Sequence, residues 1–248
     1  MLLLLAFPAQ AQDFPKLSGR VVDAAELLAP AEEAALTQKL EALETASTRQ
    51  LVVATVPDLQ GYDIADYGYR LGRAWGIGQE EANNGTILLV APNERKVRIE
   101  VGYGLEPILT DALSSIIIQT EILPRFRDGD FPGGIMAGAD AIIAQLQAPP
   151  ELAEQRAMEA AAQQQASDEG GSIFPLIFWG IVILFILIPM IGGGKRGRRY
   201  RRGGLPIVIW GPGTGGGGWG GGSSGGGGFG GFSGGGGSFG GGGASGGW

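Results

Sequence analysis

The chain has 248 residues, with 47 glycines and neither histidine nor cysteine. The lack of both residue types excludes disulfides, Cys/His zinc sites, and Ser-His-Asp or Cys-His nucleophile pairs. A metal site would have to use oxygen ligands, which favours Ca²⁺ or Mg²⁺. The net charge of −7 divides into −13 before residue 170 and +6 after it. The first part therefore suits cations better than nucleic acid, and no nucleic-acid partner is expected.

Residues 1–11, MLLLLAFPAQA, are expected to be a secretory signal peptide. A short apolar run precedes an A-x-A sequence, and cleavage is expected after Ala11. The basic segment that normally comes first is missing, so the signal peptide is expected to be truncated by a start codon placed too late. A plain cytoplasmic N-terminus is the alternative.

Residues 12–150 are long enough to form one domain with a hydrophobic core. A helix is predicted over 31–47 by leucines spaced three and four residues apart, and a buried strand is predicted over 50–56. A second helix is expected to begin after Asp63, which can cap it, and to end at Gly76.

The second half of this region begins with a predicted hairpin. An apolar strand at 85–92 is followed by turn residues and by the alternating strand 95–101. A helix that begins at Thr110 is expected to stop at Pro124, and a last helix is predicted over 132–146. The order β, α, β, α, β, β, α, α predicts a three-layer α/β/α sandwich with a mixed sheet of about four strands.

Residues 151–172 are expected to be a polar linker and residues 173–192 a transmembrane helix. The helix would contain twenty residues without a charge, which at about 1.5 Å per residue match the thickness of the hydrocarbon core. The block 193–202 carries six Lys and Arg residues, so the positive-inside rule places it in the cytoplasm and the acidic domain outside. We therefore expect a single-pass protein of the bacterial inner membrane with a periplasmic N-terminal domain.

The tail, residues 203–248, is rich in glycine and serine and carries widely spaced aromatic residues. Such a composition buries too little apolar surface to offset chain entropy, so the tail is expected to be disordered and cytoplasmic. Its aromatic residues could contact a partner, or the tail could be flexible without one.

Oxygen-bearing side chains gather in loops that could meet at one rim of the sheet. Gly102 and Gly104 let the chain bend after the predicted strand 95–101, which places Glu106 and Asp111 near the end of that strand. In α/β sheets, ligands bind at the carboxyl ends of strands. These loops are therefore candidates for one wall of a binding site.

Each candidate side chain also has a purely structural explanation. Asp111 lies at a helix start, where an acid is stabilised without a ligand. Asp23 could cap the turn that follows it, and Glu100 could pair with Arg98 on a solvated face. Asn84 could belong to a simple turn before a strand.

Several stretches between residues 18 and 146 follow the pattern of a known family. They include GRVVDAAELL, NNGTILLVAPNERKVRIEVGYGLEPILTDAL and ILPRFRDGDFPGGIMAGADAII. The chain resembles the TPM-domain family and, with its apolar span, basic block and Gly-rich ending, the bacterial membrane-anchored YgcG-like members. The resemblance implies an α/β/α sandwich. Some members are reported to bind calcium through acidic loop residues, a plant relative is described as an acid phosphatase, and an animal relative is an accessory protein of a receptor channel.

The resemblance also implies a set of metal ligands, with Ca²⁺ as the possible cofactor. The residues at the matching positions are Asp23, Glu106 and Asp111, joined by Glu100 and Asn84. The favoured interpretation is a non-enzymatic, membrane-tethered module that binds Ca²⁺ and acts as an accessory protein for an unidentified envelope or membrane protein, and no catalytic residue is assigned. The alternative is a metal-dependent acid phosphatase, in which a carboxylate attacks phosphorus or activates water.

Overall fold

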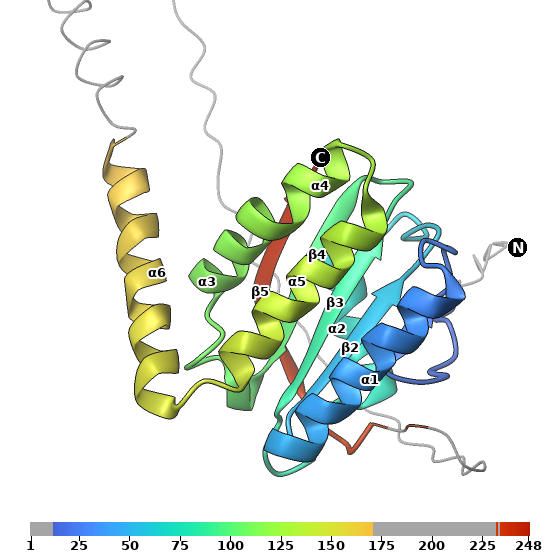
Figure 1. Cartoon of the computed structure of the whole chain (residues 1–248), viewed down its shortest axis with the longest axis horizontal. Helices are drawn as coiled ribbons and strands as arrows, with labels where there is room; N and C mark the ends of the chain where they lie inside the picture. Colours follow the sequence, from blue (N-terminus) through green and yellow to red (C-terminus); the bar gives the residue numbers. More distant parts are fainter. Residues whose placement is uncertain (1–11, 171–231, 233) are drawn as a thin grey trace, which may run out of the picture. The chain divides into compact units, whose positions relative to one another are not determined.

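The computed structural model describes residues 12–170, 232 and 234–248. The predicted signal peptide, transmembrane helix and basic block, and most of the Gly-rich tail, lie outside these residues. The end of the chain belongs to the same compact unit as the N-terminal domain (Figure 1). Among the helices that are described, none combines the length and the apolar character that crossing a membrane requires.

A mixed five-stranded sheet forms the middle layer, and its strands lie in chain order. The first three strands are parallel, and the fourth and fifth are each antiparallel to the preceding strand. The strands are β1 (Val21–Asp23), β2 (Gln50–Thr55), β3 (Gly85–Ala91), β4 (Lys96–Gly102) and β5 (Phe239–Gly247). The predicted four strands correspond to β1–β4. The prediction of a wholly disordered tail is wrong for its last residues, because they form β5.

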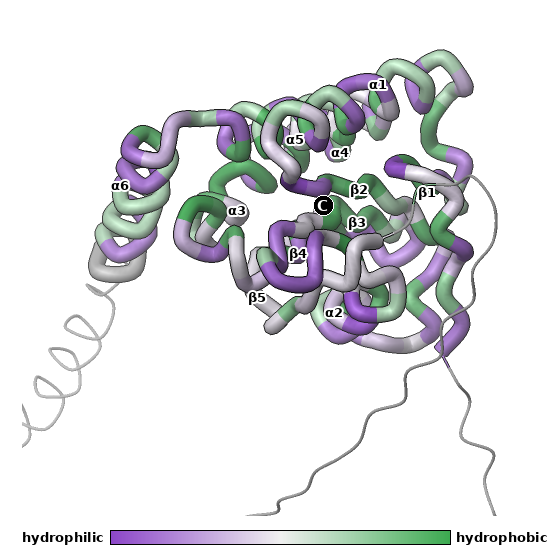
Figure 2. The backbone as a smooth tube through the Cα atoms, turned by 90° about the horizontal axis from the view of Figure 1, so that it is seen from below, coloured by the Kyte–Doolittle hydropathy of each residue, from purple (hydrophilic) through white to green (hydrophobic). Residues whose placement is uncertain are grey.

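Helices cover both faces of the sheet, with α2 on one face and α1, α4 and α5 on the other (Figure 2). The helices are α1 (Pro30–Ser47), α2 (Ile64–Trp75), α3 (Asp111–Ile117), α4 (Leu123–Arg127), α5 (Phe131–Leu146) and α6 (Pro150–Gly170), with a 3₁₀ turn η1 (Tyr103–Leu105) and a π-helical turn η2 (Ile118–Ile122). The predicted α/β fold with a mixed sheet is confirmed, and the sheet has five strands where about four were expected.

The alternation of the strands explains why two separate cores form. Val97, Ile99 and Val101 of β4 are fully buried in the core on the side of the sheet that α1, α4 and α5 cover. Ile87 and Leu89 of β3 face α2 and are buried in the second core. Successive side chains of a strand point to opposite faces, so a sheet that is covered on both sides needs apolar residues at nearly every position.

The helix that begins after Thr110 does not stop at Pro124. The backbone N–H of Leu123 donates to the carbonyl of Ile118, five residues back, which is the widened hydrogen bond of a π turn. Pro124 then lies in the first turn of α4, where its missing N–H leaves no hydrogen bond unmade. The chain therefore passes the proline with only a local change of helix type.

The segment predicted as a polar linker begins as helix α6. Ala153, Ala157 and Ala160 lie on one side of this helix and are almost fully buried. The Gln145 side chain donates a 2.9 Å hydrogen bond to the carbonyl of Ala153. Alanine spacing of four and three residues gives the helix a narrow apolar stripe, which is enough to dock it on the domain.

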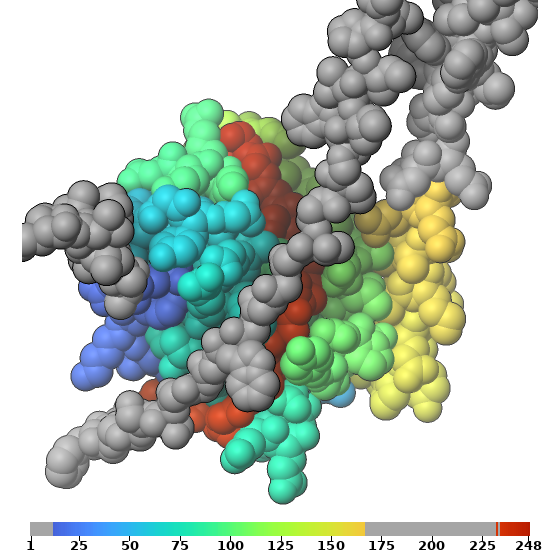
Figure 3. Space-filling view, turned by 180° about the vertical axis from the view of Figure 1, so that it is seen from behind, coloured from blue at the N-terminus to red at the C-terminus, as the bar shows by residue number. Residues whose placement is uncertain are grey.

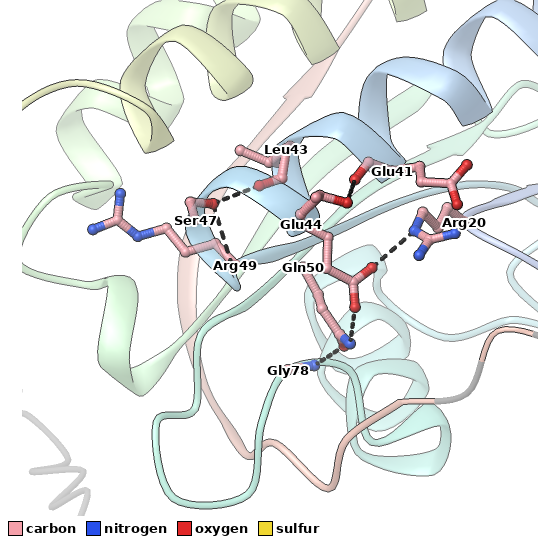
Figure 4. A network of polar contacts seen from close by, with 9 residues as sticks. Arg20, Glu41, Leu43, Glu44, Ser47, Arg49, Gln50 and Gly78 are labelled. Carbon is pink, nitrogen blue, oxygen red and sulfur yellow. Dashed lines mark hydrogen bonds and ion pairs between the residues drawn. The ribbon is translucent and has the colours of Figure 1, made fainter.

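A polar network at the amino end of β2 fixes the loop that precedes β3 (Figure 4). The Glu44 carboxylate accepts hydrogen bonds from Arg20 at 2.8 Å and from the Gln50 amide at 2.9 Å. The Gln50 side-chain oxygen in turn accepts a 2.6 Å bond from the backbone N–H of Gly78. The network therefore holds residues 78–84 against the sheet, next to the end of β4.

Candidate functional site at the β4 edge

Strand β4 has β3 on one side and the C-terminal segment, residues 238–248, on the other. The register runs from Lys96 opposite Gly247 to Val101 opposite Gly242, and an irregularity follows before Gly102. In Figure 3 the segment is a red band that lies between α2 (cyan) and α3 (green). We call the outer side of β4, with the parts of α2, Asn83 and the 103–111 loop that flank it, the β4 edge.

Two aromatic side chains anchor the C-terminal segment. Phe239 is fully buried against α2, where a Cβ on Gly72 would lie only 2.8 Å from its ring. Trp248 packs edge-on against Phe126 and Phe131, with ring centroids 4.6 and 5.8 Å apart. Such pairs add about 0.5–1.5 kcal/mol beyond the area that they bury. The anchors therefore help to offset the large entropy cost of ordering a glycine strand.

The glycines between the anchors let the segment approach β4 closely. Gly243 has φ +119°, and a Cβ at this position would lie 1.9 Å from the carbonyl oxygen of Ile99. A Cβ on Gly246 would lie 2.5 Å from the Ile118 side chain. Glycine is thus required at specific positions, and the composition of the segment reflects a fit to the edge.

A buried ion pair on β4 holds the middle of the segment. Arg98 forms an ion pair with Glu100, and both side chains are almost fully inaccessible to solvent. The guanidinium also donates 2.9 Å hydrogen bonds to the Ser245 hydroxyl and to the carbonyl of Gly241. Burial raises the pKa of the Glu100 carboxyl, Arg98 opposes that rise, and Asp111 adds to it. Among the described residues, the second oxygen of Glu100 has no hydrogen-bond partner.

The loops at the end of β4 bind the backbone of the same segment. Asp111 accepts a 2.6 Å hydrogen bond from the N–H of Gly243, and Asn83 accepts a 2.7 Å bond from the N–H of Ser238. The Glu106 carboxylate borders Gly242, where a Cβ would lie 3.0 Å from its oxygen. The loop after β4 is therefore a wall of a binding site, and the occupant is the end of the chain.

Comparison with known proteins identifies the domain that carries this edge. A profile of the TPM domain matches residues 21–145, half of the chain. The chain belongs to the TPM domain family. No curated protein matches the chain.

Three solution structures resemble the TPM domain. The N-terminal domain of a protein from P. gingivalis is 35% identical, the match covers 52% of this chain and 83% of that domain's chain, and the TM-score is 0.49. The N-terminal domain of the cg2496 protein from Corynebacterium glutamicum is 17% identical, with coverage of 57% and 90% and a TM-score of 0.43. The BA42 protein from Bizionia argentinensis is 19% identical, with coverage of 49% and 82% and a TM-score of 0.44.

Three of the five predicted ligands, Glu100, Glu106 and Asp111, line one stretch of the C-terminal segment. Glu100 forms an ion pair with Arg98, as the structural alternative expected, but the pair is buried and not solvated. Asn84 lies beside them in the sequence but supports the loop: it accepts from the N–H of Gln79 at 2.9 Å and donates to a carbonyl of α1's C-cap at 3.0 Å. Within the described part of the chain, no three acidic side chains are grouped closely enough to hold a metal ion.

Asp23 does not share this rim of the TPM domain. It lies opposite Thr55 at the carboxyl end of β1, level with the start of β4. Its two oxygens accept hydrogen bonds from the N–H groups of Leu27 and Leu28 at 3.0 and 2.8 Å. Because β4 is antiparallel to β3, its carboxyl end lies at the amino ends of the parallel strands. The expected convergence was therefore wrong for Asp23, whose structural explanation as a turn cap is correct.

Sequence reasoning missed the residues that bind the segment from the TPM domain. Gly72, Phe126 and Phe131 form the pockets for the two anchors. A signal was available in the tail itself, where Phe239 and Trp248 stand at the two ends of a run of small residues. A wholly flexible tail has no need for aromatic residues, so their placement could have indicated docking.

A hollow of about 230 Å³ lies away from the β4 edge, at the carboxyl ends of β1 and β2, where ligands of α/β sheets commonly bind. Asp13 and Asp58 line it together with Tyr67. Burial and the two carboxylates raise the pKa of Tyr67 to about 12. The phenol therefore stays protonated at neutral pH.

Proposed function

We propose that the protein is a membrane-tethered accessory module of the cell envelope, whose TPM domain binds an extended segment of a partner protein along the β4 edge. The observation that supports this function is the way in which the edge holds β5. Side chains of β4, α2 and the 103–111 loop contact the strand, in addition to the backbone ladder. In strand addition, main-chain hydrogen bonds supply affinity and side-chain pockets supply specificity.

The proposed tether is segment 173–192, with the basic block 193–202 on the cytoplasmic side. A strand ladder cannot form through a bilayer, so a chain inserted once in this way keeps its own C-terminal segment apart from its TPM domain. A chain with β5 in place has both parts on one side. We therefore propose two arrangements: the inserted chain presents an open β4 edge to a partner, and the uninserted chain covers that edge with its own segment. Covering an exposed edge also protects it from aggregation.

The absence of cysteine allows a direct test of the tethered arrangement. Single cysteines are introduced at Ala46, which is exposed on α1, and at Ser224 in the tail. In intact cells, a membrane-impermeant maleimide should label Ala46→Cys at once and Ser224→Cys only after permeabilisation. Equal labelling of both positions in intact cells would refute a single span.

Binding by the open edge is tested on the same membranes. A fluorescent peptide of residues 234–248 is added to the outside of sealed vesicles that contain the inserted chain. We expect saturable binding, and protection of the β4 amides (96–102) from hydrogen exchange. If the peptide does not bind to vesicles in which the TPM domain is outside, the accessory function proposed here is wrong.

A second proposed property is Ca²⁺ binding by the loop oxygens when the edge is open. The supporting observations are that Glu106 and Asp111 border neighbouring glycines of the segment, Gly242 and Gly243, and that one Glu100 oxygen lacks a partner among the described residues. An extracellular carboxylate site of roughly 10⁻⁴–10⁻³ M affinity would be useful. In a chain whose β5 is displaced, Ca²⁺ should shift the amide NMR signals of residues 103–111. The Asp111→Asn variant should show no such shifts. Shifts that are unchanged by that substitution would exclude this site.

The phosphatase alternative requires a carboxylate that is free to attack phosphorus. Asp111 is hydrogen-bonded to Gly243 when β5 is docked, so turnover would need an open edge. Phosphate esters incubated with the inserted chain should remain intact if the protein only binds. Turnover that is lost in Asp111→Asn and blocked by the 234–248 peptide would instead favour the phosphatase.

A further inference from the structure

We infer that the β4 edge recognises a ten-residue pattern: Phe at position one, Gly at positions five and eight, and Trp at position ten. The inference rests on the proposed function and names its ligand class, a glycine-rich segment bounded by two aromatic residues nine positions apart. Residues 239–248 of this chain, FGGGGASGGW, are one example. A partner would carry the same pattern in an extended segment.

The spacing of the two aromatic positions is fixed by the domain. The pocket for position one is on α2, where Gly72 leaves room for the Phe239 ring. The pocket for position ten is formed by Phe126 of α4 and Phe131 of α5. These helices pack on the same sheet, so the distance between the pockets cannot adapt to a longer or shorter ligand.

Both glycine positions exclude larger residues, and position five does so more strictly than position eight. Position five faces the carbonyl oxygen of Ile99, which belongs to the backbone of β4, is held by the ladder with β3 and cannot move aside. Position five also has φ +119°, a conformation that side chains disfavour. Position eight faces a methyl group of Ile118, a buried side chain with limited room to shift.

Polar groups of the edge add three further requirements. Arg98 donates to the carbonyl at position three, where the positive φ of +85° also favours glycine, and to a hydroxyl at position seven. Asp111 accepts from the N–H at position five, which excludes proline there. Because Arg98 is buried, a ligand that offers no acceptors leaves a charged donor partly unsatisfied, at a cost in affinity.

The rest of the tail shows how selective this pattern is. Residues 219–228 (WGGGSSGGGG) and 229–238 (FGGFSGGGGS) also begin with an aromatic residue and are rich in glycine. Both have serine at position five and lack an aromatic residue at position ten. They provide matched controls with nearly the same composition as the segment that binds.

The test uses the full chain with Gly243→Ala, which disfavours docking of its own segment and leaves the TPM domain unchanged. Four fluorescent peptides are compared by anisotropy: residues 239–248, the same peptide with alanine at position five, the same peptide with alanine at position two, and residues 229–238. We expect the position-five variant and 229–238 to bind at least about tenfold more weakly than the parent, since the added Cβ meets backbone. The position-two variant should stay within about twofold: its Cβ would lie 2.3 Å from the Tyr103 ring, but this side chain is 53% exposed and can turn away, unlike the backbone of Ile99.

A second variant of the host tests the pocket for position one. Gly72→Ala should strongly weaken binding of the parent peptide, because the new Cβ would meet the phenylalanine ring at position one. Binding of a peptide with leucine at position one should be weakened much less. Double-mutant analysis of these four affinities isolates the contact. A coupling of zero would show that α2 does not select position one and would contradict the inferred pattern.

The outcomes separate the inference from the function on which it rests. If none of the peptides binds, strand acceptance itself fails, and the inference fails with it. If all four bind equally, the edge accepts strands without regard to sequence, so the proposed function stands and the pattern is wrong. If the Gly243→Ala host is not folded by circular dichroism, the same peptides are compared as competitors of β5 in the wild-type chain, by the exchange rates of amides 96–102.

Discussion

The two edges of the sheet use aspartate in different ways. At the β1 edge, Asp23 accepts hydrogen bonds from backbone groups four and five positions further along the chain. At the β4 edge, Asp111 accepts its bond from Gly243, 132 positions away. A local cap forms with the fold and stays with it, whereas a long-range bond exists only while a separate segment is docked. The exchange of occupants proposed for the β4 edge would therefore break long-range bonds of this kind and leave local caps such as that of Asp23 in place.

The largest effect is expected at the β1 edge. Asp23→Ala removes the acceptor for Leu27 and Leu28 and the partner of the Thr55 hydroxyl. We expect the free energy of unfolding to fall by roughly 3 kcal/mol, because hydrogen bonds to a charged group are among the stronger ones. Denaturant unfolding of the full chain measures this loss.

The control for this change is Asp140→Ala, which removes an exposed ion pair with Lys39. Its cost should stay below about 1 kcal/mol. Equal losses for the two variants would show that Asp23 is no more structural than an ordinary surface acid, and the contrast between the edges would disappear.

The next effect is expected at the end of β5. Trp248→Ala removes the contacts with Phe126 and Phe131 and should weaken docking of the segment by about 2 kcal/mol, since Trp248 is only partly buried, while the rest of the domain stays folded. Hydrogen exchange at residues 96–102 should accelerate before global unfolding. Tyr103→Ala removes an aromatic residue that is 53% exposed, and serves as the control. Exchange that accelerates equally in both variants would contradict the role of Trp248 as an anchor.

Most of the sandwich could be predicted because its signals are local. Asp63 caps α2 by accepting from the N–H of Ala65, and Gly76 ends that helix in the left-handed conformation, both as expected. The hairpin of β3 and β4 follows from two apolar stretches around a short turn. Each of these signals depends on residues within a few positions of one another, which a sequence displays directly.

The β4 edge could be predicted only in part, because its contacts join distant parts of the chain. The loop with Glu106 and Asp111 was predicted as a candidate wall of a metal site, but its contact with the end of the chain was not predicted. The glycine-rich composition predicts a large entropy cost for ordering the strand. It does not reveal the contacts of Phe239 and Trp248, at the two ends of the glycine-rich stretch, which help to offset that cost. Arg98 was predicted to lie on a solvated face. The alternation of β4 shows that Arg98 points away from the core of Val97, Ile99 and Val101, but it does not show that α2 covers the opposite face of the sheet.

A smaller effect should separate Asp111 from its neighbour Glu106. Asp111→Ala removes the hydrogen bond to Gly243 and should weaken docking of β5 by about 1–2 kcal/mol, with little change in global stability. Glu106→Ala removes only a side chain that borders Gly242, and should change docking by less than about 0.5 kcal/mol. Hydrogen exchange at 96–102 reports both. If global unfolding changes as much as docking does in Asp111→Ala, then Asp111 resembles Asp23 and the two edges do not differ.

The smallest effect is the dependence of stability on pH through Glu100. Burial raises the pKa of this carboxyl from its ordinary value of 4.5, and Arg98 only partly opposes the rise. The folded protein therefore takes up this proton at a higher pH than the unfolded chain does. The group's contribution to stability is fully present below pH 4.5 and is lost as the pH rises through the pKa of the folded state.

Glu100→Gln should remove this contribution. The substitution has its own cost, which comes from leaving Arg98 without an anionic partner, but this cost is the same at each pH and cancels in the comparison. The free energies of unfolding of the two proteins are measured between pH 7 and pH 4.5. As the pH falls, the wild type should gain stability relative to Glu100→Gln, because only the wild type takes up the proton of Glu100. A wild type that loses stability relative to Glu100→Gln on acidification would mean that Arg98 outweighs burial, and that the pair stabilises the β4 edge as an ionised unit.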